Sequence, residues 1–431
     1  MANDLLKQAL SEYDDVRKRY IAALEEHGIV FAEEGANDAR IQQLRDELRK
    51  AGAEFKNAGA SIVYGWQSKA CVECTGTGGS ETFSTTFKCH RDCYFCFNYN
   101  VADYDKFVRE GCPWEQGLAD SLEQFDGLAA IGLTGGEPLL VLDESVEFLE
   151  RAREAYPDAH LRMYTSGDLL TEEGAARLRD AGLREIRFSV KQDDEPERQE
   201  RVLQAMQLAK RYIPDVMVEM PIIPGTGGRM RELFDRWAEI GIDGINLLEF
   251  CFPFHSWDEF AARGFEIRNP PFDVMYDYGY SGGLPVAGSE ELCLELMLYG
   301  IEQHAPFGMH YCSLDNKHRS EMRQRNERGA RIHPCYRFDR GDFFLKTAKV
   351  FGEDRELAKK ALISAGCMDY MNLDHEGSTC FPMRFAGKVR DAGADVCTSF
   401  NVLQQDGEGA YLQEVGLVLD DMTRTEGTEP F

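Results

Sequence analysis

Apolar and polar residues follow two different periods along this chain, and the change between them falls shortly after residue 65. Over residues 4–50 the apolar side chains recur about every 3.6 positions, with an interruption from Gly35 to Asn37. This period predicts two helices separated by a short break. Residues 1–65 are therefore expected to form an N-terminal helical hairpin.

From residue 82 onward, short apolar runs alternate with amphipathic stretches. The apolar runs, each expected to be a strand, cover residues 82–87, 129–133, 161–165, 185–190, 216–223 and 245–250. The stretches expected to be helices cover residues 144–155, 171–181, 198–211 and 230–240. Strands that recur with a helix between them predict βαβ units, and hence an α/β fold with a parallel sheet and right-handed crossovers.

Local signals support the helices in this region. Asp143 and Thr171 are expected to be N-caps, and Gly182 and Gly241 follow helix ends. We therefore expect a core domain over residues 66–260.

The rest of the chain is expected to add two further parts. Residues 261–340 extend the core, and residues 341–431 form a C-terminal α+β appendage. The appendage is expected to hold a helix over residues 354–365 and a hairpin that turns at residues 406–409.

Three cysteines with CxxxCxxC spacing, Cys89, Cys93 and Cys96, directly follow the first apolar run. Three thiolates in one loop can hold an iron–sulfur cluster while leaving one iron without a protein ligand, whereas ferredoxin clusters take four cysteines. The alternative is a structural zinc site, which usually needs four ligands in paired knuckles. A zinc site predicts nothing at residues 133–138, Leu-Thr-Gly-Gly-Glu-Pro, which close the second apolar run.

Together these two motifs resemble the radical S-adenosylmethionine (radical SAM) superfamily. The resemblance implies a partial (β/α)6 TIM-like barrel, a 4Fe–4S cluster on the three cysteines, and SAM bound to the remaining iron. It also implies that Phe95 lies beside the adenine. The segment Gly135, Gly136 and Glu137 would face the SAM amino group. In barrels of this kind the active site lies at the carboxyl ends of the strands, where both motifs fall.

Other strand ends supply further candidates. The resemblance assigns Thr165 and Ser166 to SAM, although a Ser/Gly turn would explain them as well. Lys191 ends a Phe-Ser-Val-Lys segment that resembles the Asp-x-Lys of pyruvate formate-lyase activases, and it is a candidate for SAM binding or catalysis. Glu219 interrupts an apolar run and would need a partner inside the barrel. Cys251 is a candidate substrate-facing thiol, or else an inert buried cysteine.

A second metal site is also a hypothesis at this stage. Cys71 and Cys74 form a C-x2-C pair followed by glycines, which is typical of half a metal knuckle. Cys312, with His310 or Cys335, could complete a site for zinc or an auxiliary iron–sulfur cluster. The alternative is two unrelated groups of free cysteines.

The middle of the chain narrows the resemblance. Residues 245–250, 263–265, 288–291 and 310–313 follow in the order found in a branch of the superfamily related to pyruvate formate-lyase activating enzymes. Members of this branch also carry the upstream C-x2-C. The resemblance covers about residues 71–325, and it implies a mechanism without supplying a substrate.

Charge and composition restrict the partners. The net charge of −27 opposes binding to nucleic acid or to anionic membrane surfaces. The sequence contains no stretch of about 18 uncharged apolar residues, so no transmembrane helix is expected. The odd number of cysteines, 13, suits a reducing cytoplasm better than a disulfide framework.

The sequence therefore predicts reductive cleavage of SAM, with hydrogen abstraction from a small-molecule or peptide substrate. Flavodoxin or ferredoxin is the expected electron donor, because no flavin or nicotinamide motif is present. Two alternatives stay open. The protein could install a glycyl radical on a partner protein, or it could be a non-enzymatic iron–sulfur binding or sensor protein.

Overall fold

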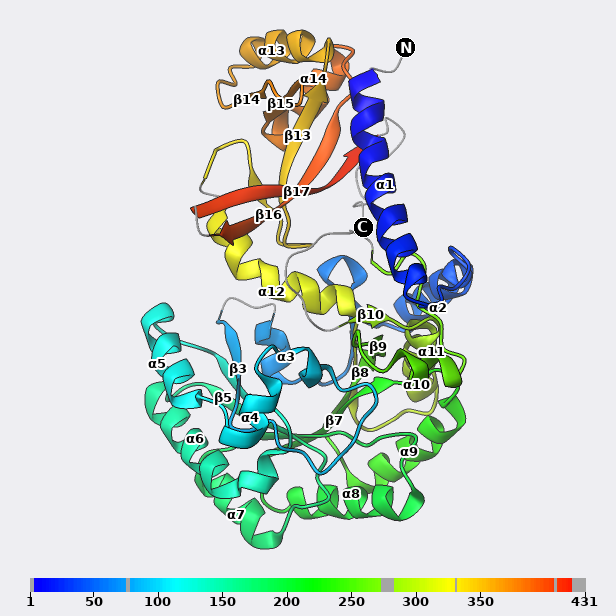
Figure 1. The fold of residues 1–431 in the computed structure, drawn as a ribbon, viewed down its shortest axis with the longest axis vertical. Helices are drawn as coiled ribbons and strands as arrows, with labels where there is room; N and C mark the ends of the chain where they lie inside the picture. Colours follow the sequence, from blue (N-terminus) through cyan, green and yellow to red (C-terminus); the bar gives the residue numbers. More distant parts are fainter. Residues whose placement is uncertain (1–3, 75–77, 273–282, 330–331, 407–408, 421–431) are drawn as a thin grey trace.

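A computed structural model describes residues 4–74, 78–272, 283–329, 332–406 and 409–420. The chain forms a lower part built around one large sheet and an upper part built around a smaller one (Figure 1). The helix α12, Leu314–Gly329, lies between them. The large sheet carries both sequence motifs.

The large sheet has nine strands in the order β1-β2-β11-β8-β7-β6-β5-β4-β3. The strands from β3 to β11 pair in parallel. Their bounds are Ser80–Ser84 (β3), Ala130–Thr134 (β4), His160–Thr165 (β5), Glu185–Phe188 (β6), Asp215–Ile222 (β7), Gly244–Glu249 (β8) and Gly308–Cys312 (β11). The first six correspond to the six predicted strands, and the α/β fold with a parallel sheet is confirmed.

The sheet continues beyond the predicted strands. The strand β11 is an additional parallel strand, and β2, Ser61–Tyr64, and β1, Glu54–Lys56, extend the sheet in the antiparallel direction. Residues 54–64, which were expected to belong to the N-terminal helical hairpin, therefore form one edge of the sheet, while β3 forms the other edge.

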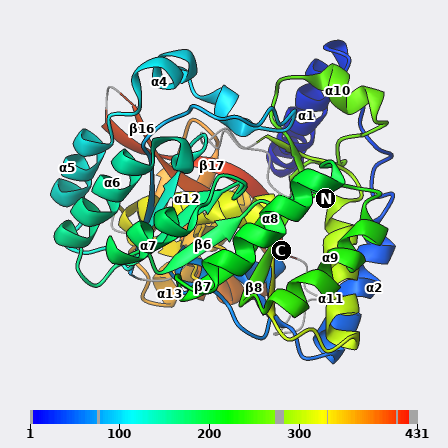
Figure 2. The same cartoon turned by 90° about the horizontal axis from the view of Figure 1, so that it is seen from below.

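Helices surround the parallel strands on the outside (Figure 2). They are α5, Trp114–Gln124; α6, Leu142–Ala155; α7, Glu172–Asp180; α8, Pro196–Ala209; α9, Gly227–Ile240; and α11, Ser289–Glu302. Their apolar faces and the strands form the main core, in which Phe148, Phe188 and Trp237 are fully buried. Burial of this apolar surface stabilises the barrel.

The predicted caps have different outcomes. Thr171 caps α7, because its hydroxyl accepts a hydrogen bond from the amide of Gly174 at 3.0 Å. Asp143 is not a cap. A 3-10 turn, Pro138–Val141, leads directly into α6 at Leu142 and places Asp143 inside the first turn of the helix.

Several shorter elements lie near the cluster motif. They are the 3-10 turn η2, Phe97–Asn100, and the helices α4, Tyr104–Glu110, and α10, Trp257–Ala262. The helix α3, Lys69–Cys74, instead contacts β3, β4 and β5. The strands β9, Cys251–Phe252, and β10, Leu284–Pro285, form a small separate pair.

The upper part is an α+β unit around a six-stranded sheet. Its strands are β12, Arg337–Phe338; β13, Leu345–Phe351; β14, Met371–Leu373; β15, Ser378–Phe381; β16, Cys397–Asp406; and β17, Gly409–Leu419. The helices are α13, Asp354–Ser364, and α14, Ala386–Asp391. Strands β16 and β17 pair as a hairpin, and the two central residues of its predicted turn, 407–408, lie outside the described residues.

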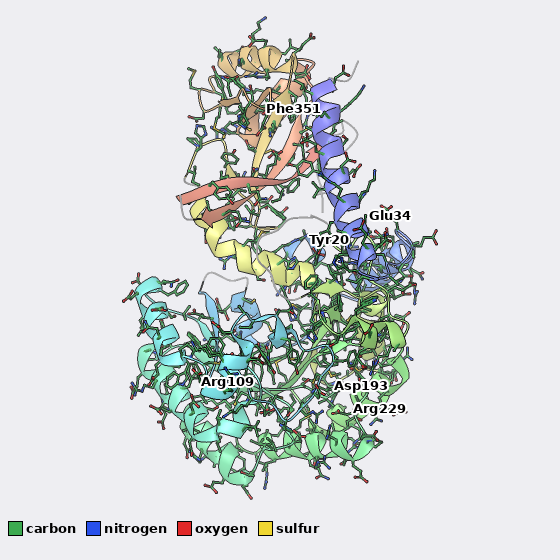
Figure 3. The ribbon with its side chains drawn as sticks, viewed as in Figure 1. Tyr20, Glu34, Arg109, Asp193, Arg229 and Phe351 are labelled. Atoms are coloured by element: carbon green, nitrogen blue, oxygen red, sulfur yellow. The ribbon has the colours of Figure 1, made fainter. Side chains whose placement is uncertain are left out.

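The two N-terminal helices form, but they contact different elements. Helix α1, Asp4–Glu26, packs on β13 and β17, where Leu6 joins Phe351 in one apolar cluster. Its other end carries Tyr20 close to the barrel (Figure 3). Helix α2, Asp38–Lys50, packs on α11 of the barrel. Within the described ranges, no helix combines the length and apolar composition needed to cross a membrane.

Candidate active site

The three cysteines of the CxxxCxxC motif lie in the loop after β3, at the carboxyl end of the parallel strands. All three are free thiols; Cys89 is exposed, and Cys93 and Cys96 are partly buried. The loop is turned by a hydrogen bond from the Cys96 amide to the Cys93 carbonyl, 3.0 Å long. Burial raises the pKa of Cys89 and that of Cys96, the latter to about 11, so cluster binding must displace protons from these thiols.

The Gly-Gly-Glu segment pairs directly with the backbone that leads into this loop. The amide of Gly136 donates to the Thr86 carbonyl at 2.8 Å, and the amide of Glu137 donates to the Lys88 carbonyl, also at 2.8 Å. A Cβ atom on Gly136 would lie 2.1 Å from the Lys88 oxygen. Only glycine permits this approach, and the two sequence motifs are therefore parts of one site.

Glu137 is buried, and its carboxylate is held by residues at the end of β5. The Thr165 hydroxyl donates at 2.6 Å to one oxygen, and the Ser166 amide and hydroxyl donate to the other at 2.8 and 2.6 Å. A fourth hydrogen bond comes from the Leu139 amide at 3.1 Å. The structure thus brings Glu137, Thr165 and Ser166 together, and here Thr165 and Ser166 contact the glutamate.

Asp168 provides a second link between β5 and the cluster loop. It accepts from His90 at 2.8 Å, from Arg91 at 3.1 Å and from Ser166 at 2.8 Å. Burial raises the pKa of the Asp168 carboxyl, but the hydrogen bonds from Ser166 and His90 outweigh this effect and lower the net pKa. Arg91 is buried and also pairs with Asp194.

Sequence reasoning missed these contacts, although the residues themselves were visible. His90 and Arg91 occupy the spacer between the first two cysteines, and Asp168 follows the predicted strand end. Two basic residues in the spacer and one acid at a neighbouring strand end were the available signal.

The other predicted SAM residues surround the same loop. Lys191, which follows β6, is buried, and its charge lowers the pKa of Cys89 and Cys96 against the larger effect of burial. The Phe95 ring packs edge-on against Phe250, with 5.5 Å between ring centroids. Figure 3 labels Asp193, two residues after Lys191, in the lower part of the molecule, to the right of Arg109.

Glu219 finds its partner inside the barrel, as its position in an apolar run required. It pairs with Arg187 and accepts from the Asn246 amide at 2.5 Å. Burial raises the pKa of Glu219, and the positive charge of Arg187 lowers it more, so the carboxyl is ionised. Its observed role is therefore in an ion pair, which extends through Arg187 to Glu185.

Among the described residues, no three of the five residues proposed for a second metal site have ligand atoms close enough for a single ion. Cys71 accepts hydrogen bonds from Arg187 and Asn246 at 3.4 and 3.1 Å. Both ring nitrogens of His310 are already hydrogen-bonded, to Asn246 at 3.0 Å and to Ser61 at 2.9 Å.

The remaining members of that set also make contacts of their own. Cys335 lies just before β12, and its sulfur contacts His333 at 3.0 Å. Cys312 accepts from Asn316 at 3.3 Å, and Cys74 is exposed at the end of α3. Burial raises the pKa of the Cys312 thiol to about 12, and the nearby Cys71 and Cys74 also raise it. The second metal site stays a prediction.

Among the described residues, one group of three has ligand atoms close enough for a single ion: His160, Glu185 and Asp215 at the starts of β5, β6 and β7. Glu185 already accepts from Arg187 and from Ser68, each at 2.5 Å. The adjacent guanidinium supplies the compensating positive charge, so this group is explained as part of the buried ion-pair network.

Cys251 lies on β9, beyond the end of β8, and is partly buried. Burial raises the pKa of its thiol to about 11, and the positive charge of Lys317 on α12 opposes this. The thiol is therefore protonated at neutral pH.

The cysteine loop fits an iron–sulfur cluster by the chemistry of its donors. It offers three reduced thiols within residues 89–96, without a fourth cysteine in the loop. The barrel that carries it holds this loop at the carboxyl end of the strands, beside the Gly-Gly-Glu segment.

Residues 83–238 match the family model of the radical SAM superfamily, and the match includes both the cysteine loop and the Gly-Gly-Glu segment. The chain is also similar to a curated protein of Methanocaldococcus jannaschii that is named as a candidate glycyl-radical enzyme activating enzyme. The two are 27% identical over 269 residues, which cover 60% of this chain and 66% of the relative, slightly less than two thirds of its length.

The similarity to solved structures is lower. SuiB of Streptococcus suis bound to S-adenosylmethionine is 15% identical, with a TM-score of 0.39 over 54% of this chain and 50% of SuiB. The methyltransferase TsrM of Kitasatospora setae is 20% identical, with a TM-score of 0.32 over 43% of this chain and 39% of TsrM. At these scores neither structure bears on the activity of this chain.

Proposed function

We propose that this protein is a radical SAM enzyme that acts on a small-molecule or peptide substrate. The observation that carries the proposal is the pairing of Gly136 and Glu137 with Thr86 and Lys88, because it joins the cysteine loop and the Gly-Gly-Glu segment into one site. When bound, the 4Fe–4S cluster and SAM supply one-electron cleavage of SAM to methionine and a 5′-deoxyadenosyl radical, which takes a hydrogen atom from the substrate.

The chain's own residues hold and orient these groups. Cys89, Cys93 and Cys96 are the proposed cluster ligands. The Glu137 side chain is fixed by donors at the end of β5, and the backbone of Gly135 and Gly136 lies beside the loop. Lys191 provides a buried positive charge near the cysteines, which favours binding of the SAM carboxylate.

The upper part of the molecule favours a small substrate. Helix α12 follows β11 directly and contacts β12, β13 and β16, so it lies between the barrel and the upper unit (Figure 1). The charge of Lys317 on this helix acts on both Glu219 and Cys251, which places the start of α12 at the barrel interior. A small molecule or a flexible peptide reaches such an interior more readily than a folded partner does.

The test is anaerobic reconstitution with iron and sulfide, followed by dithionite and SAM. We expect release of 5′-deoxyadenosine, and about four irons per chain, which excludes an auxiliary cluster. A Cys93→Ala variant should release none, and a Cys112→Ala variant, which removes a partly buried thiol outside the motif, should behave as wild type. Wild-type protein that holds its cluster and releases no more than Cys93→Ala would disprove the proposal.

A second candidate function comes from the Methanocaldococcus jannaschii relative, whose name assigns it to glycyl-radical activation. Here the hydrogen donor would be a glycine of a partner protein. Adding such a partner to the assay should then accelerate 5′-deoxyadenosine release and produce a glycyl radical detectable by EPR. Flavodoxin or ferredoxin is the proposed physiological electron donor in either case.

A further inference from the structure

His255 lies between β9 and α10, and its ring contacts the cysteine loop at Cys96. The atom Nε2 is 2.7 Å from the carbonyl oxygen of Cys96, and Nδ1 is 2.9 Å from the hydroxyl oxygen of Ser256. A carbonyl oxygen only accepts hydrogen bonds, so Nε2 carries the proton and donates it. Nδ1 is then left to pair with the Ser256 hydroxyl, and the two contacts together hold the plane of the ring.

The backbone on both sides of His255 is strained. Phe254 has a φ of 65° and Ser256 a φ of 57°, although neither is glycine. Left-handed backbone is unfavourable for residues with a Cβ, and it persists where surrounding contacts require it. Phe254 and Ser256 lie on either side of His255, which indicates that surrounding contacts hold this turn so that the ring points at Cys96.

A second contact confines the same ring. Tyr99 lies in the 3-10 turn η2, which begins directly after Cys96, and its ring packs edge-on against His255 with 4.7 Å between centroids. The His255 ring is therefore held on one side by Ser256 in its own turn and on the other by Tyr99 in η2. Loss of the ring would release the Cys96 peptide.

We propose that His255 is a positioning residue that fixes the Cys96 peptide and makes the cluster easier to reduce. The inference rests on the proposed function, because it takes Cys96 to be a cluster ligand. An N–H group that donates next to a ligand places partial positive charge near the cluster, and this charge stabilises the reduced state, which carries one more negative charge. The electron comes from the external donor, and the histidine itself is neither oxidised nor reduced.

The experiment compares the midpoint potential of the reconstituted cluster in three variants. His255→Leu removes the donor, His255→Gln retains an N–H group, and His27→Leu removes a histidine that makes a 2.7 Å contact with a backbone carbonyl on α1, far along the chain from the motif. We expect His255→Leu to lower the equilibrium constant for reduction about tenfold, which is about 59 mV for one electron. His255→Gln should recover most of this change, and His27→Leu should match wild type.

The outcomes separate this inference from the proposed function. A wild-type potential in His255→Leu would overturn it, as would an equal shift, or loss of the cluster, in both His255 variants. Cluster loss in His255→Leu alone, with retention in His255→Gln, supports it. Wild-type protein that cleaves SAM while His255→Leu keeps its potential refutes only the role of His255, whereas wild-type protein that binds no cluster refutes the proposed function itself.

Discussion

Gly136→Ala is the most direct test of how the two motifs are joined. The added Cβ would lie 2.1 Å from the Lys88 oxygen and 2.6 Å from the Phe87 carbonyl carbon, where ordinary contact begins at 3.4 Å. The difference between the 2.1 Å contact and the 3.4 Å limit means that the backbone preceding the cysteine loop must move by more than 1 Å. This movement breaks the hydrogen bonds from Gly136 to Thr86 and from Glu137 to Lys88.

The magnitude follows from these contacts. Overpacking costs about 1–3 kcal/mol, and each lost hydrogen bond about 1 kcal/mol, so the barrel should lose about 3–5 kcal/mol of unfolding free energy. Affinity for SAM and cluster content should fall as well. The matched control is Gly228→Ala in α9, where a Cβ meets no atom within 4 Å. There alanine should be neutral or stabilising by up to about 1 kcal/mol.

Urea unfolding followed by tryptophan fluorescence can measure this change in the barrel. All 4 tryptophans lie between residues 66 and 257, so the signal reports the barrel rather than the upper unit. If Gly136→Ala unfolds at the same urea concentration as wild type and keeps its cluster, the close approach between the motifs is not as the structure shows it. Equal damage by Gly228→Ala would likewise refute the reasoning.

Three further predictions concern buried charge and the N-terminal helix. Arg187→Met leaves Glu185 and Glu219 without their cation and should cost about 3–5 kcal/mol by tryptophan fluorescence, with partial recovery when Glu219→Gln is added. Burial raises the pKa of Glu249 to about 7 from an ordinary 4.5, so the folded protein holds a proton that the unfolded chain has lost. The contribution of Glu249 to the free energy of unfolding is full below pH 4.5 and is lost as the pH rises through 7. Over this window wild type should lose about 3 kcal/mol of unfolding free energy relative to Glu249→Gln. Equal slopes of stability against pH in the two proteins would contradict this. Tyr13→Phe removes a 2.7 Å hydrogen bond to β17 and should cost about 1 kcal/mol, measured as faster proteolytic removal of α1; unchanged cleavage would contradict it.

Most of the barrel strands could be predicted because they are short runs of mainly buried residues. The strand β3, Ser80–Ser84, has only one buried residue, and it begins two residues before the predicted run of residues 82–87. The strand β11 could not be predicted, since its sequence, Gly-Met-His-Tyr-Cys, mixes polar residues that line the interior with buried apolar ones. That mixture suggested metal ligands at His310 and Cys312. In the structure it reflects alternation between the core and a polar barrel interior.

The sequence predicted which segments form the candidate site, but not the hydrogen bonds that join their side chains. Motif spacing identified the cysteines and the Gly-Gly-Glu segment, but Glu137 contacts β5 through side chains that any Thr-Ser turn could supply. His255 gave no signal at all, because a histidine in an aromatic segment has no periodicity that indicates its partner. Such contacts depend on tertiary packing between segments about 160 residues apart along the chain.

The docking of α1 has a consequence for the order of folding during synthesis. Tyr13 bonds to a residue 401 positions later, so α1 cannot take its final place until β17 has left the ribosome. At about 5–20 residues per second, the apolar face of α1 stays uncovered for roughly 20–80 s, while the consecutive βα units of the barrel can already assemble. Helix α1 is thus made before the barrel and docks after it, and nascent chains of this protein are expected to depend on chaperones that cover this helix.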